Sequence, residues 1–546
     1  MISFDNVTLT YPAAKSPALA HVNVHISAGE LVLVVGPTGS GKSTLLEMIN
    51  GLVPHFTGGS LVGAVRVAGR ATENYPPRDM ADVVGLVRQD PQRGFVTDVV
   101  EDELAYTMES LAIAPAVMRR RVEETLDLLG LAQLRTRPLR NMSGGQQQRV
   151  AIGSVLTANP KVLVLDEPTS ALDPQAAEEV LATLQRLVHD LGFTVVLSEH
   201  RLERAIQYAD SVLLLDEFGG VTHFANPAEA MAVSRIVPPI VSLGRWAGWH
   251  PLPLTVRDAR RRAVGLRDQL ETVGAGAPGP TTSSGAIVAT MQKASCKYGD
   301  FVALRPTTVN VRAGEIVAVI GRNGSGKSTL LSLLAGGQTP TSGSALVNGH
   351  DPADLRGPDL LSNVGFVPQE PQSLLWSESV ADECRAADHD ANVAPGTTWR
   401  LLRELRTGLD PATHPDNLSE GSRLCLVLAV MLVADSALVL LDEPTRGLDY
   451  EAKRRLVTAL KARSVAGQAI VLATHDVELI AELCTRVIML AEGEVVLDEA
   501  CRPALLASPM FAPQVGKIVA PLPYLTIAEV MQALTDDASS VEGAPR

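Results

Sequence analysis

Short apolar runs separated by polar segments recur along the chain and predict buried strands. The runs "LVLVV" (31–35) and "KVLVLDE" (161–167) in the first half, and "IVAVI" (316–320) in the second, have the continuous apolar character of strands in a parallel sheet. A Gly-rich loop follows the first run, and "STLLEMINGL" (43–52) then places apolar residues at helical spacing. This pattern predicts α/β domains.

The sequence also repeats itself. "GPTGSGKST" begins at Gly36 and "GRNGSGKST" at Gly321, while "VLVLDEPTSALD" ends at Asp173 and "LVLLDEPTRGLD" at Asp449. The tripeptides "SEH" and "ATH" then follow in the same order. Because several motifs recur in one order, we infer that a whole domain is duplicated in tandem.

The boundary between the copies lies in "GAGAPGPTTSSG" (274–285), whose composition is typical of a flexible linker. We therefore expect a first domain, an appended segment with the linker, a second domain and a C-terminal appended segment. Their ranges are 1–235, 236–285, 286–505 and 506–546.

A smaller repeat follows each domain. "WHPLPLTVRDARR" (249–261) resembles "VAPLPYLTIAEVMQAL" (519–534), and each is expected to form a turn and a helix. Two interpretations stay open: a strut that packs on its own domain, or an interface between the halves.

Composition and charge narrow the function classes. The 546 residues are too many for one hydrophobic core and fit two domains. The net charge of −14 argues against a protein whose main function is to bind nucleic acid. The five cysteines lack CxxC spacing, so neither a disulfide framework nor a zinc site is expected. The N-terminus does not resemble a signal peptide, and no apolar run approaches the roughly 18–20 residues that cross a bilayer.

The loop after the strand at 31–35 matches GxxxxGK[ST], a phosphate-binding loop, and the second half repeats it. Its glycines let backbone N–H groups face phosphate oxygens, and the helix N-terminus adds partial positive charge. The lysine would bind the outer phosphates and the serine hydroxyl would bind Mg²⁺. The residues expected to bind nucleotide here are Gly36, Gly39, Gly41, Lys42, Ser43 and Thr44, and Gly321, Gly324, Gly326, Lys327, Ser328 and Thr329.

An acidic pair ends a buried strand in each half. Asp166 and Asp442 are expected to hold Mg²⁺, and Glu167 and Glu443 to polarise the attacking water as general bases. A solvated acidic turn would not explain why both pairs follow a buried strand.

Two further pairs recur after short strands. His200 and His475 each end an apolar strand, and their matching positions favour a catalytic role over a structural one. Gln89 and Gln369 recur as well, and an amide there could bind Mg²⁺ or water.

An aromatic residue precedes each phosphate loop. Tyr11 and Tyr298 are candidates for stacking on the nucleotide base, and a plain core aromatic is the competing interpretation.

These motifs together resemble two ATP-binding cassette (ABC) nucleotide-binding domains fused head to tail. The signature "MSGGQQQR" (142–149) separates this family from other P-loop NTPases. The resemblance covers nearly the whole chain. It implies an α/β fold of two P-loop cassettes, each an ATP-binding core with a helical subdomain, and an ATPase that uses ATP and Mg²⁺.

In this family two domains sandwich two ATPs, each between one phosphate loop and the signature of the other domain. Because both halves belong to one chain, we expect an intramolecular pseudo-dimer at high effective concentration. The resemblance implies two ATP sites. One combines Lys42, Glu167 and His200 of the first half with Ser419 and Gly421 of the second. The other combines Lys327, Glu443 and His475 of the second half with Ser143 and Gly145 of the first.

The second signature, "NLSEGSRLCL" (417–426), is altered, since Glu420 stands where the first has Gly144. A carboxylate about 4 Å from a phosphate would cost about 1 kcal/mol in water and more where water is excluded. Either it weakens the Lys42/Ser419 site, leaving Lys327/Ser143 the faster one, or it points away and both sites are equivalent.

The stretch "RGFVTDVVEDELAY" (93–106) and "SEHRLE" (198–203) resemble the ATPases of energy-coupling factor (ECF) transporters. This resemblance implies import of a vitamin, its precursor or a transition-metal ion. The chain would then be cytoplasmic and peripheral on the inner face of the cell membrane. It would bind a transmembrane coupling subunit and an integral substrate-binding subunit as separate chains, and no nucleic acid.

In that family the ATPases bind coupling helices of the membrane subunit. The resemblance implies that such a helix would bind near Asp98, Glu101, Asp102 and Glu103 in this chain. The competing interpretation is an acidic helix start. Two other machines stay open, a fused ATPase of a sugar-type importer and a soluble tandem ABC switch acting on the ribosome or nucleic acid.

Overall fold

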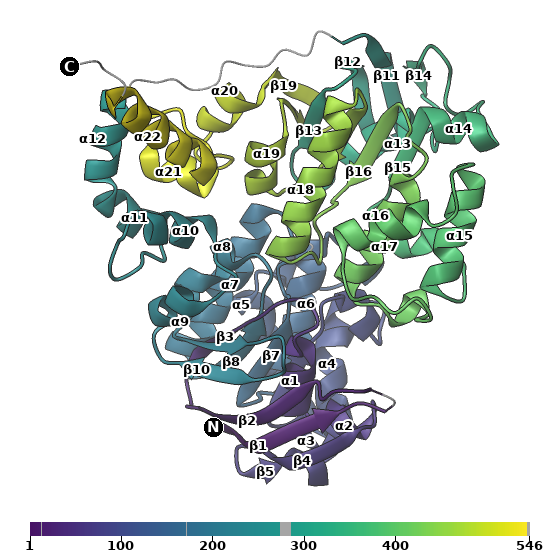
Figure 1. Cartoon of the computed structure of the whole chain (residues 1–546). Coiled ribbons are helices and arrows are strands. Elements are labelled where there is room, and N and C mark those ends of the chain that lie inside the picture. The colour runs from purple at the N-terminus through teal and green to yellow at the C-terminus, as the bar shows by residue number, and fades with distance from the viewer. Residues whose placement is uncertain (13, 171, 274–284, 543–546) are drawn as a thin grey trace. The chain divides into compact units, whose positions relative to one another are not determined.

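The apolar runs of the sequence form the centres of two six-stranded sheets, one in each of two units of the chain (Figure 1). The units are Met1–Leu254 and Thr255–Arg546. The computed structural model describes residues 1–12, 14–170, 172–273 and 285–542. Residues 274–284, on which most of the predicted linker falls, lie outside the described residues.

The central sheet of the first unit has the strand order β10-β9-β3-β8-β7-β6. Its five strands from β9 to β6 pair in parallel and β10 pairs antiparallel, and every residue of β3 is buried, as its unbroken apolar sequence predicts. The strands are β3 (Leu31–Val35), β6 (Val84–Val87), β7 (Val162–Asp166), β8 (Thr194–Ser198), β9 (Ser211–Leu215) and β10 (Val221–Phe224).

A second, antiparallel sheet has the order β2-β1-β4-β5. One helix, α1 (Lys42–Ile49), contacts both sheets, and the apolar side chains of all three elements form one buried core. This arrangement anchors the helix that begins at the phosphate lysine. The strands are β1 (Ile2–Thr10), β2 (Leu19–Ile26), β4 (Ser60–Val67) and β5 (Arg70–Ala71).

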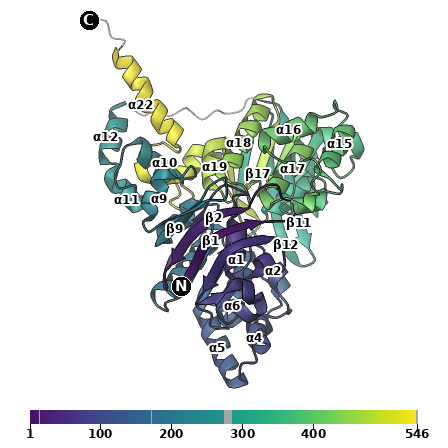
Figure 2. The same cartoon turned by 60° about the horizontal axis from the view of Figure 1, so that its bottom comes forward.

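Helices α4, α5 and α6 contact one another and form a helical subdomain (Figure 2). The longer helices of the unit are α4 (Val100–Ser110), α5 (Pro115–Leu128), α6 (Gly144–Leu156), α7 (Pro174–His189) and α10 (Pro239–Trp246). The short ones are α2 (Leu52–His55), α3 (Pro77–Met80), α8 (Leu202–Ala205), α9 (Pro227–Val233), η1 (Thr72–Asn74), η2 (Pro91–Gly94), η3 (Ala132–Leu134), η4 (Leu139–Asn141) and η5 (Ile206–Tyr208).

The second unit repeats this plan, with sheets of order β15-β16-β17-β13-β18-β19 and β12-β11-β14. Its strands are β11 (Ile287–Tyr298), β12 (Phe301–Arg312), β13 (Ile316–Ile320), β14 (Ser342–Val347), β15 (Val364–Val367), β16 (Leu438–Asp442), β17 (Ala469–Ala473), β18 (Arg486–Ala491) and β19 (Glu494–Ala500). Helix α13 contacts both sheets, and α15, α16 and α17 form the helical subdomain.

The helices of this unit are α11 (Val256–Arg262), α12 (Val264–Val273), α13 (Lys327–Leu334), α14 (Gly357–Asn363), α15 (Val380–Asp390), α16 (Thr397–Leu405), α17 (Glu420–Leu432), α18 (Tyr450–Val465), α19 (Val477–Leu483), α20 (Cys501–Leu506), α21 (Gln514–Val519) and α22 (Ile527–Glu542), with η6 (Pro371–Leu374) and η7 (Pro415–Asn417). The predicted α/β class, with a helical subdomain in each half, is confirmed. Of the described helices, none combines the length and the apolar character needed to cross a membrane.

The segments appended to the two halves pack on each other. Helix α11 contacts α21, and α12 lies beside α22 (Figure 2). The Arg267 guanidinium on α12 donates to the Ile518 carbonyl on α21 at 3.4 Å. Residues 255–273 follow the first cassette along the chain but belong to the second unit. This agrees with an interface between the appended segments and not with a strut that packs only on its own domain.

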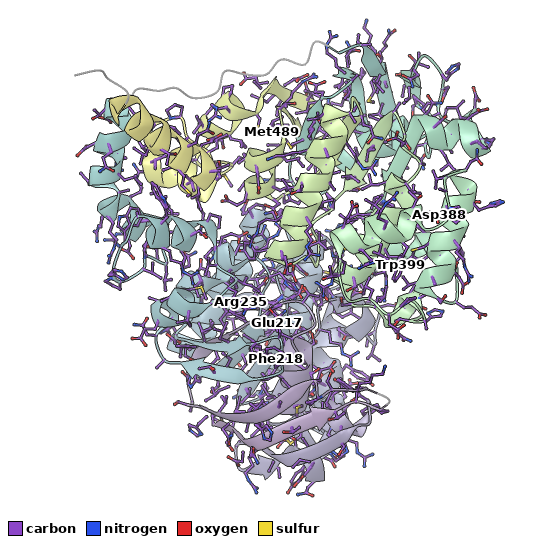
Figure 3. All side chains as sticks on the ribbon, viewed as in Figure 1. Glu217, Phe218, Arg235, Asp388, Trp399 and Met489 are labelled. Carbon is purple, nitrogen blue, oxygen red and sulfur yellow. The ribbon has the colours of Figure 1, made fainter. Side chains whose placement is uncertain are left out.

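A buried carboxylate closes the turn between α15 and α16. Asp388 is 4% exposed, and it accepts the N–H of Gly396 at 2.6 Å and both the N–H and the hydroxyl of Thr398 at 2.7 and 2.6 Å (Figure 3). Burial acts to raise the pKa of Asp388, but the hydrogen bonds from Thr398 and Gly396 outweigh it and lower that pKa. The charge therefore stabilises the start of α16.

We predict that Asp388→Ala lowers the free energy of unfolding by about 2–3 kcal/mol, because hydrogen bonds to a buried charge are lost. Urea unfolding followed by circular dichroism measures the change. Asp390→Ala is the matched control, since the Asp390 side chain is 70% exposed on the same helix, and it should change stability by less than about 0.5 kcal/mol. Equal effects of the two substitutions would contradict this role of Asp388.

Candidate active site

Parallel pairing brings the carboxyl ends of three strands to one edge of the first sheet. In register, Val34 at the end of β3 pairs with Ser198 of β8, and Asp166 of β7 also pairs with Ser198. The Ser198 hydroxyl donates to the Asp166 carboxylate at 2.5 Å. Because the carboxyl ends of parallel strands meet at one edge, the phosphate loop, the acidic pair and the histidine become neighbours.

The first phosphate loop is shaped by glycine. Gly41 precedes α1 with φ +95°, and a Cβ there would lie 2.7 Å from the Ala18 carbonyl oxygen. The Lys42 ammonium donates to the carbonyls of Gly36 and Pro37 at 2.9 and 3.0 Å, which folds the lysine over its own loop. Any side chain at position 41 would therefore disturb the loop that positions Lys42.

The second loop has the same geometry. Gly326 has φ +103°, and a Cβ there would lie 2.5 Å from the Ala303 carbonyl oxygen. Lys327 donates to the carbonyls of Gly321 and Arg322 at 2.8 and 3.0 Å. Both loops are thus built to present backbone N–H groups and a lysine to an anion.

The residues expected to bind Mg²⁺ are oxygen donors placed next to the phosphate loops. Burial raises the pKa of Asp166, as does the charge of Glu167, and a hydrogen bond with Ser43 partly offsets the rise. Burial likewise raises the pKa of Asp442, and Ser328 partly offsets it. A hydroxyl and a carboxylate fit Mg²⁺, which keeps water and phosphate oxygens as its other ligands. Within the described residues no group of three His, Cys, Asp or Glu side chains gathers to hold a metal ion.

The two glutamates expected to be general bases share an unusual backbone. Glu167 has φ +48° and Glu443 has φ +51°, in the left-handed region that non-glycine residues rarely adopt. Strain of this kind costs on the order of 1–3 kcal/mol and persists where surrounding contacts enforce it. The Glu167 N–H donates to the Ser198 carbonyl at 3.2 Å and to the Ser198 hydroxyl at 3.1 Å. The Glu443 N–H donates to the Ala473 carbonyl at 2.8 Å.

In the first half Glu167 lies between the predicted glutamine and histidine. The Gln89 amide donates to its carboxylate at 2.8 Å, and Nε2 of His200 lies 2.7 Å from its other oxygen. The structure therefore brings these three predicted residues into contact, at the geometry needed to orient a carboxylate toward a water molecule.

The second half differs in detail. Thr474 donates its hydroxyl to Glu443 at 3.3 Å, and Nε2 of His475 is 3.5 Å from Glu443. The same Nε2 lies 3.1 Å from the Asn323 side-chain oxygen in the phosphate loop, and Gln369 is exposed. The base and the histidine are therefore neighbours here too, with Asn323 as an additional partner that the sequence did not reveal.

Each signature serine begins a helix. Ser143 precedes α6 and its hydroxyl accepts the Gln146 N–H at 3.3 Å, and Ser419 precedes α17 and accepts the Ser422 N–H at 3.3 Å. Both serines are exposed, while Gly145 and Gly421 are buried. Each signature thus presents the positive end of a 13-residue helix.

The two tyrosines lie in different surroundings. Tyr11 packs against the first core and its hydroxyl is 3.0 Å from that of Thr44, and burial raises the pKa of Tyr11. Tyr298 is 48% exposed. Thr329, the counterpart of Thr44, is half-buried.

The motifs in the sequence did not indicate a role for one carboxylate that the structure buries. Glu199, between Ser198 and His200, is 3% exposed and accepts the Thr169 N–H at 2.9 Å. Burial raises the pKa of Glu199 to about 7, and the charge of Glu167 raises it further while Thr169 lowers it. Its only signal in the sequence was an acidic residue directly after an apolar strand.

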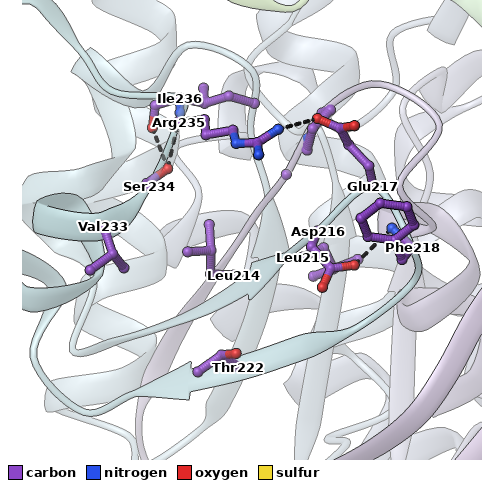
Figure 4. Close-up of a pocket in the computed structure, with 12 residues that line it drawn as sticks. Leu214, Leu215, Asp216, Glu217, Phe218, Thr222, Val233, Ser234, Arg235 and Ile236 are labelled. Atoms are coloured by element: carbon purple, nitrogen blue, oxygen red, sulfur yellow. Dashed lines mark hydrogen bonds and ion pairs between the residues drawn. The ribbon is translucent and has the colours of Figure 1, made fainter.

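A pocket of about 200 Å³ opens beside the first phosphate loop (Figure 4). An ion pair at 2.6 Å joins Arg235 to Glu217 at its edge, and Phe218 nearby is 82% exposed (Figures 3 and 4). Of the described phosphate-loop residues it touches only Gly36 and Pro37, so it is not the phosphate site. The lining residues are Gly36, Pro37, Leu214, Leu215, Asp216, Glu217, Phe218, Thr222, Val233, Ser234, Arg235 and Ile236.

Comparison with known proteins agrees with this geometry. The family model described as "ABC transporter" matches residues 19–170 and 304–446. A "Putative ABC transporter ATP-binding protein" of Streptomyces avermitilis is 57% identical and covers 98% of this chain and 100% of its own, and one of Methanosarcina mazei is 32% identical, covering 91% and 88%. The archaeal ribosome recycling factor aABCE1, solved with stalk protein aP1, superposes with a TM-score of 0.59 at 20% identity, covering 92% and 91%.

We predict that Glu199→Gln reduces the loss of stability that occurs as the pH rises from about 4.5 to about 7. A carboxyl whose pKa is raised on folding contributes stability that is fully present below its unfolded pKa and lost as pH rises through about 7. Glutamine keeps an oxygen for the Thr169 N–H and cannot ionise. Thermal unfolding at pH 5 and pH 8.5 should give a smaller difference for the variant, by on the order of 2 kcal/mol. An unchanged difference would show that Glu199 does not titrate in this range.

Proposed function

The chain belongs to the ABC transporter family, and from that premise we propose that it is the ATP-hydrolysing subunit of a membrane importer of the ECF type. It is an ATPase with two cassettes. The proposed cargo is a vitamin, a vitamin precursor or a transition-metal ion, and the proposed location is the cytoplasmic face of the cell membrane. Its partners would be a transmembrane coupling subunit and an integral substrate-binding subunit, with no nucleic acid.

We propose that the two ATPs bind between the halves when the chain closes. Lys42, Glu167 and His200 would act with the helix start at Ser419, and Lys327, Glu443 and His475 with the helix start at Ser143. The exposed signature serines support this pairing, because a helix N-terminus stabilises a γ-phosphate that approaches from outside. Bound Mg²⁺ would neutralise charge on the transferring phosphoryl group. Glu443 and Glu167 would take a proton from water while the histidines hold their carboxylates.

The Lys327/Ser143 site is proposed to be the faster of the two. Its signature keeps Gln146 and Arg149, and the other signature has Ser422 and Cys425 at these places. Burial raises the pKa of the Cys425 thiol to about 12, so this residue supplies no charge in place of the arginine.

The observation that carries the membrane role is an exposed apolar side chain at the same place in both halves. Val96 follows η2 and is 60% exposed, and Trp376 follows η6 and is 86% exposed. We propose that these two side chains are contact points for a partner, because each lies at the same place in its half and a large apolar side chain contributes strongly when an interface buries it.

Buried glutamates hold these loops in place. The Glu103 carboxylate accepts the N–H groups of Val96 and Thr97 at 3.0 and 2.8 Å. The Glu383 carboxylate accepts the N–H of Trp376 at 3.1 Å and that of the next residue at 2.8 Å. Glu103 is therefore buried, and it is not part of the exposed acidic surface near which the sequence placed the contact.

Exposed carboxylates lie close in sequence to the two apolar contact points. Asp98 and Asp102 are exposed near Val96, and Glu378 is exposed near Trp376. An apolar side chain among acidic residues fits an amphipathic helix that carries basic residues, as the coupling helix of a membrane subunit would. The ribosome-acting alternative rests on likeness of fold to aABCE1 and has no comparable feature in these residues.

We predict that Glu443→Gln lowers ATP turnover by about 10²-fold, as loss of a general base does, and that Glu167→Gln lowers it only a few-fold. Steady-state phosphate release from the purified chain measures both. Equal losses would contradict the proposed asymmetry, and no loss in either variant would remove both glutamates from catalysis.

We predict that the double variant Val96→Ala and Trp376→Ala loses its membrane subunits but keeps its ATPase activity. The tagged chain is purified from its native membranes, and mass spectrometry identifies what accompanies it. Val465→Ala is the matched control, because Val465 is 90% exposed at the end of α18. A multi-spanning subunit bound by wild type and control but not by the double variant is the expected result. Ribosomal proteins in its place would contradict the importer proposal.

A further inference from the structure

The acidic residue in the second signature has a cationic partner within its own half. Glu420 is the first residue of α17, directly after the N-cap serine Ser419. Its Oε1 lies 3.0 Å from Nε of Arg446, in the turn that follows the acidic pair at the end of β16. The two side chains are only 32% and 22% exposed, so solvent screens their attraction less than at an open surface.

The ion pair belongs to a group of changes that fit one another. The first half has Gly144 and Ser170 at the places of Glu420 and Arg446, so neither half gains net charge there. Next to the arginine lies Gly447, with φ +71°, and a Cβ on it would lie 3.1–3.3 Å from three side-chain carbons of Glu420. The glycine leaves the space that the glutamate side chain fills.

The same turn packs closely on the signature helix. A Cβ on Gly421 would lie 2.3 Å from the Gly447 carbonyl oxygen. The turn at 445–449 and the start of α17 therefore form one packed unit, in which Oε1 of Glu420 lies 3.0 Å from Nε of Arg446.

We propose that Arg446 is a positioning residue for the ATP site formed by Lys42 and Ser419. It holds Glu420 against the turn and neutralises it, so that Ser419 and the start of α17 can receive a γ-phosphate that an unpaired carboxylate would repel. The altered signature is thus a compensated one, which retains ATP although it lacks the residues of the faster site. The inference rests on the pairing of Lys42 with Ser419 proposed above and is independent of the membrane role.

The test measures equilibrium binding of Mg·ATP to the full chain in a background with Lys327→Ala and Glu167→Gln. In this background the loop of Lys42 is the phosphate loop that keeps its lysine, and bound ATP is not expected to be hydrolysed there. Arg446→Ser should raise the Kd about fivefold, the effect of one carboxylate charge about 4 Å from a phosphate in water. Adding Glu420→Gln should restore the Kd, and the loss should shrink in high salt, because both outcomes depend on charge. Arg70→Ser is the matched control. It breaks the 2.6 Å ion pair between Arg70 and Asp82, which lies far from Glu420 and Arg446 in the sequence, and it should leave the Kd unchanged.

An unchanged Kd in Arg446→Ser would overturn the proposal. A loss that Glu420→Gln fails to restore would also overturn it, because Arg446 would then act by itself and not through Glu420. The variant Ser419→Arg distinguishes a failure of the Arg446 proposal from a failure of the proposed pairing between the Lys42 loop and Ser419. If Ser419→Arg leaves the Kd unchanged, the Lys42/Ser419 site itself is wrong, and the inference about Arg446 falls with it.

Discussion

Parallel pairing of the central strands is the constraint on which each cassette depends. In the first half β3, β8 and β7 are neighbours in register, so their carboxyl ends bring a lysine loop, an acidic pair and a histidine to one edge. The second half repeats this with β13, β17 and β16. The strands are buried on both faces, and their order cannot change without exposing apolar side chains. Catalytic geometry is in this sense a consequence of core packing.

Local contacts refine what the sheets bring together. Both glutamates proposed as general bases adopt a left-handed backbone that the neighbouring strand holds by hydrogen bonds. Around this shared geometry the halves diverge: Glu167 is held by Gln89 and His200, whereas His475 is shared between Glu443 and Asn323. In the altered signature of the second half, the charge of Glu420 is balanced by Arg446 at 3.0 Å, whereas the first half has the uncharged residues Gly144 and Ser170 at these places.

The sequence predicted much of this, for physical reasons that differ between features. Unbroken apolar runs predicted the parallel strands, and the motif GxxxxGK[ST] predicted a helix directly after each phosphate loop. In the structure these helices begin at Lys42 and at Lys327. The partner of Glu420 could not be predicted, since Arg446 is 26 residues away and only the fold brings them together. Burial of Glu103 was missed for a similar reason, because its exposed neighbours share its acidic character and only backbone N–H groups distinguish it.

The central claim is that one chain forms two ATP sites, each from the phosphate loop of one half and the signature of the other. Counting the ATP bound per chain in the variant Glu167→Gln and Glu443→Gln tests it most directly. The account predicts two ATPs per monomeric chain, of which Ser419→Arg removes one and Ser143→Arg the other. Two ATPs that persist with both signatures altered, or binding that requires two chains, would contradict it.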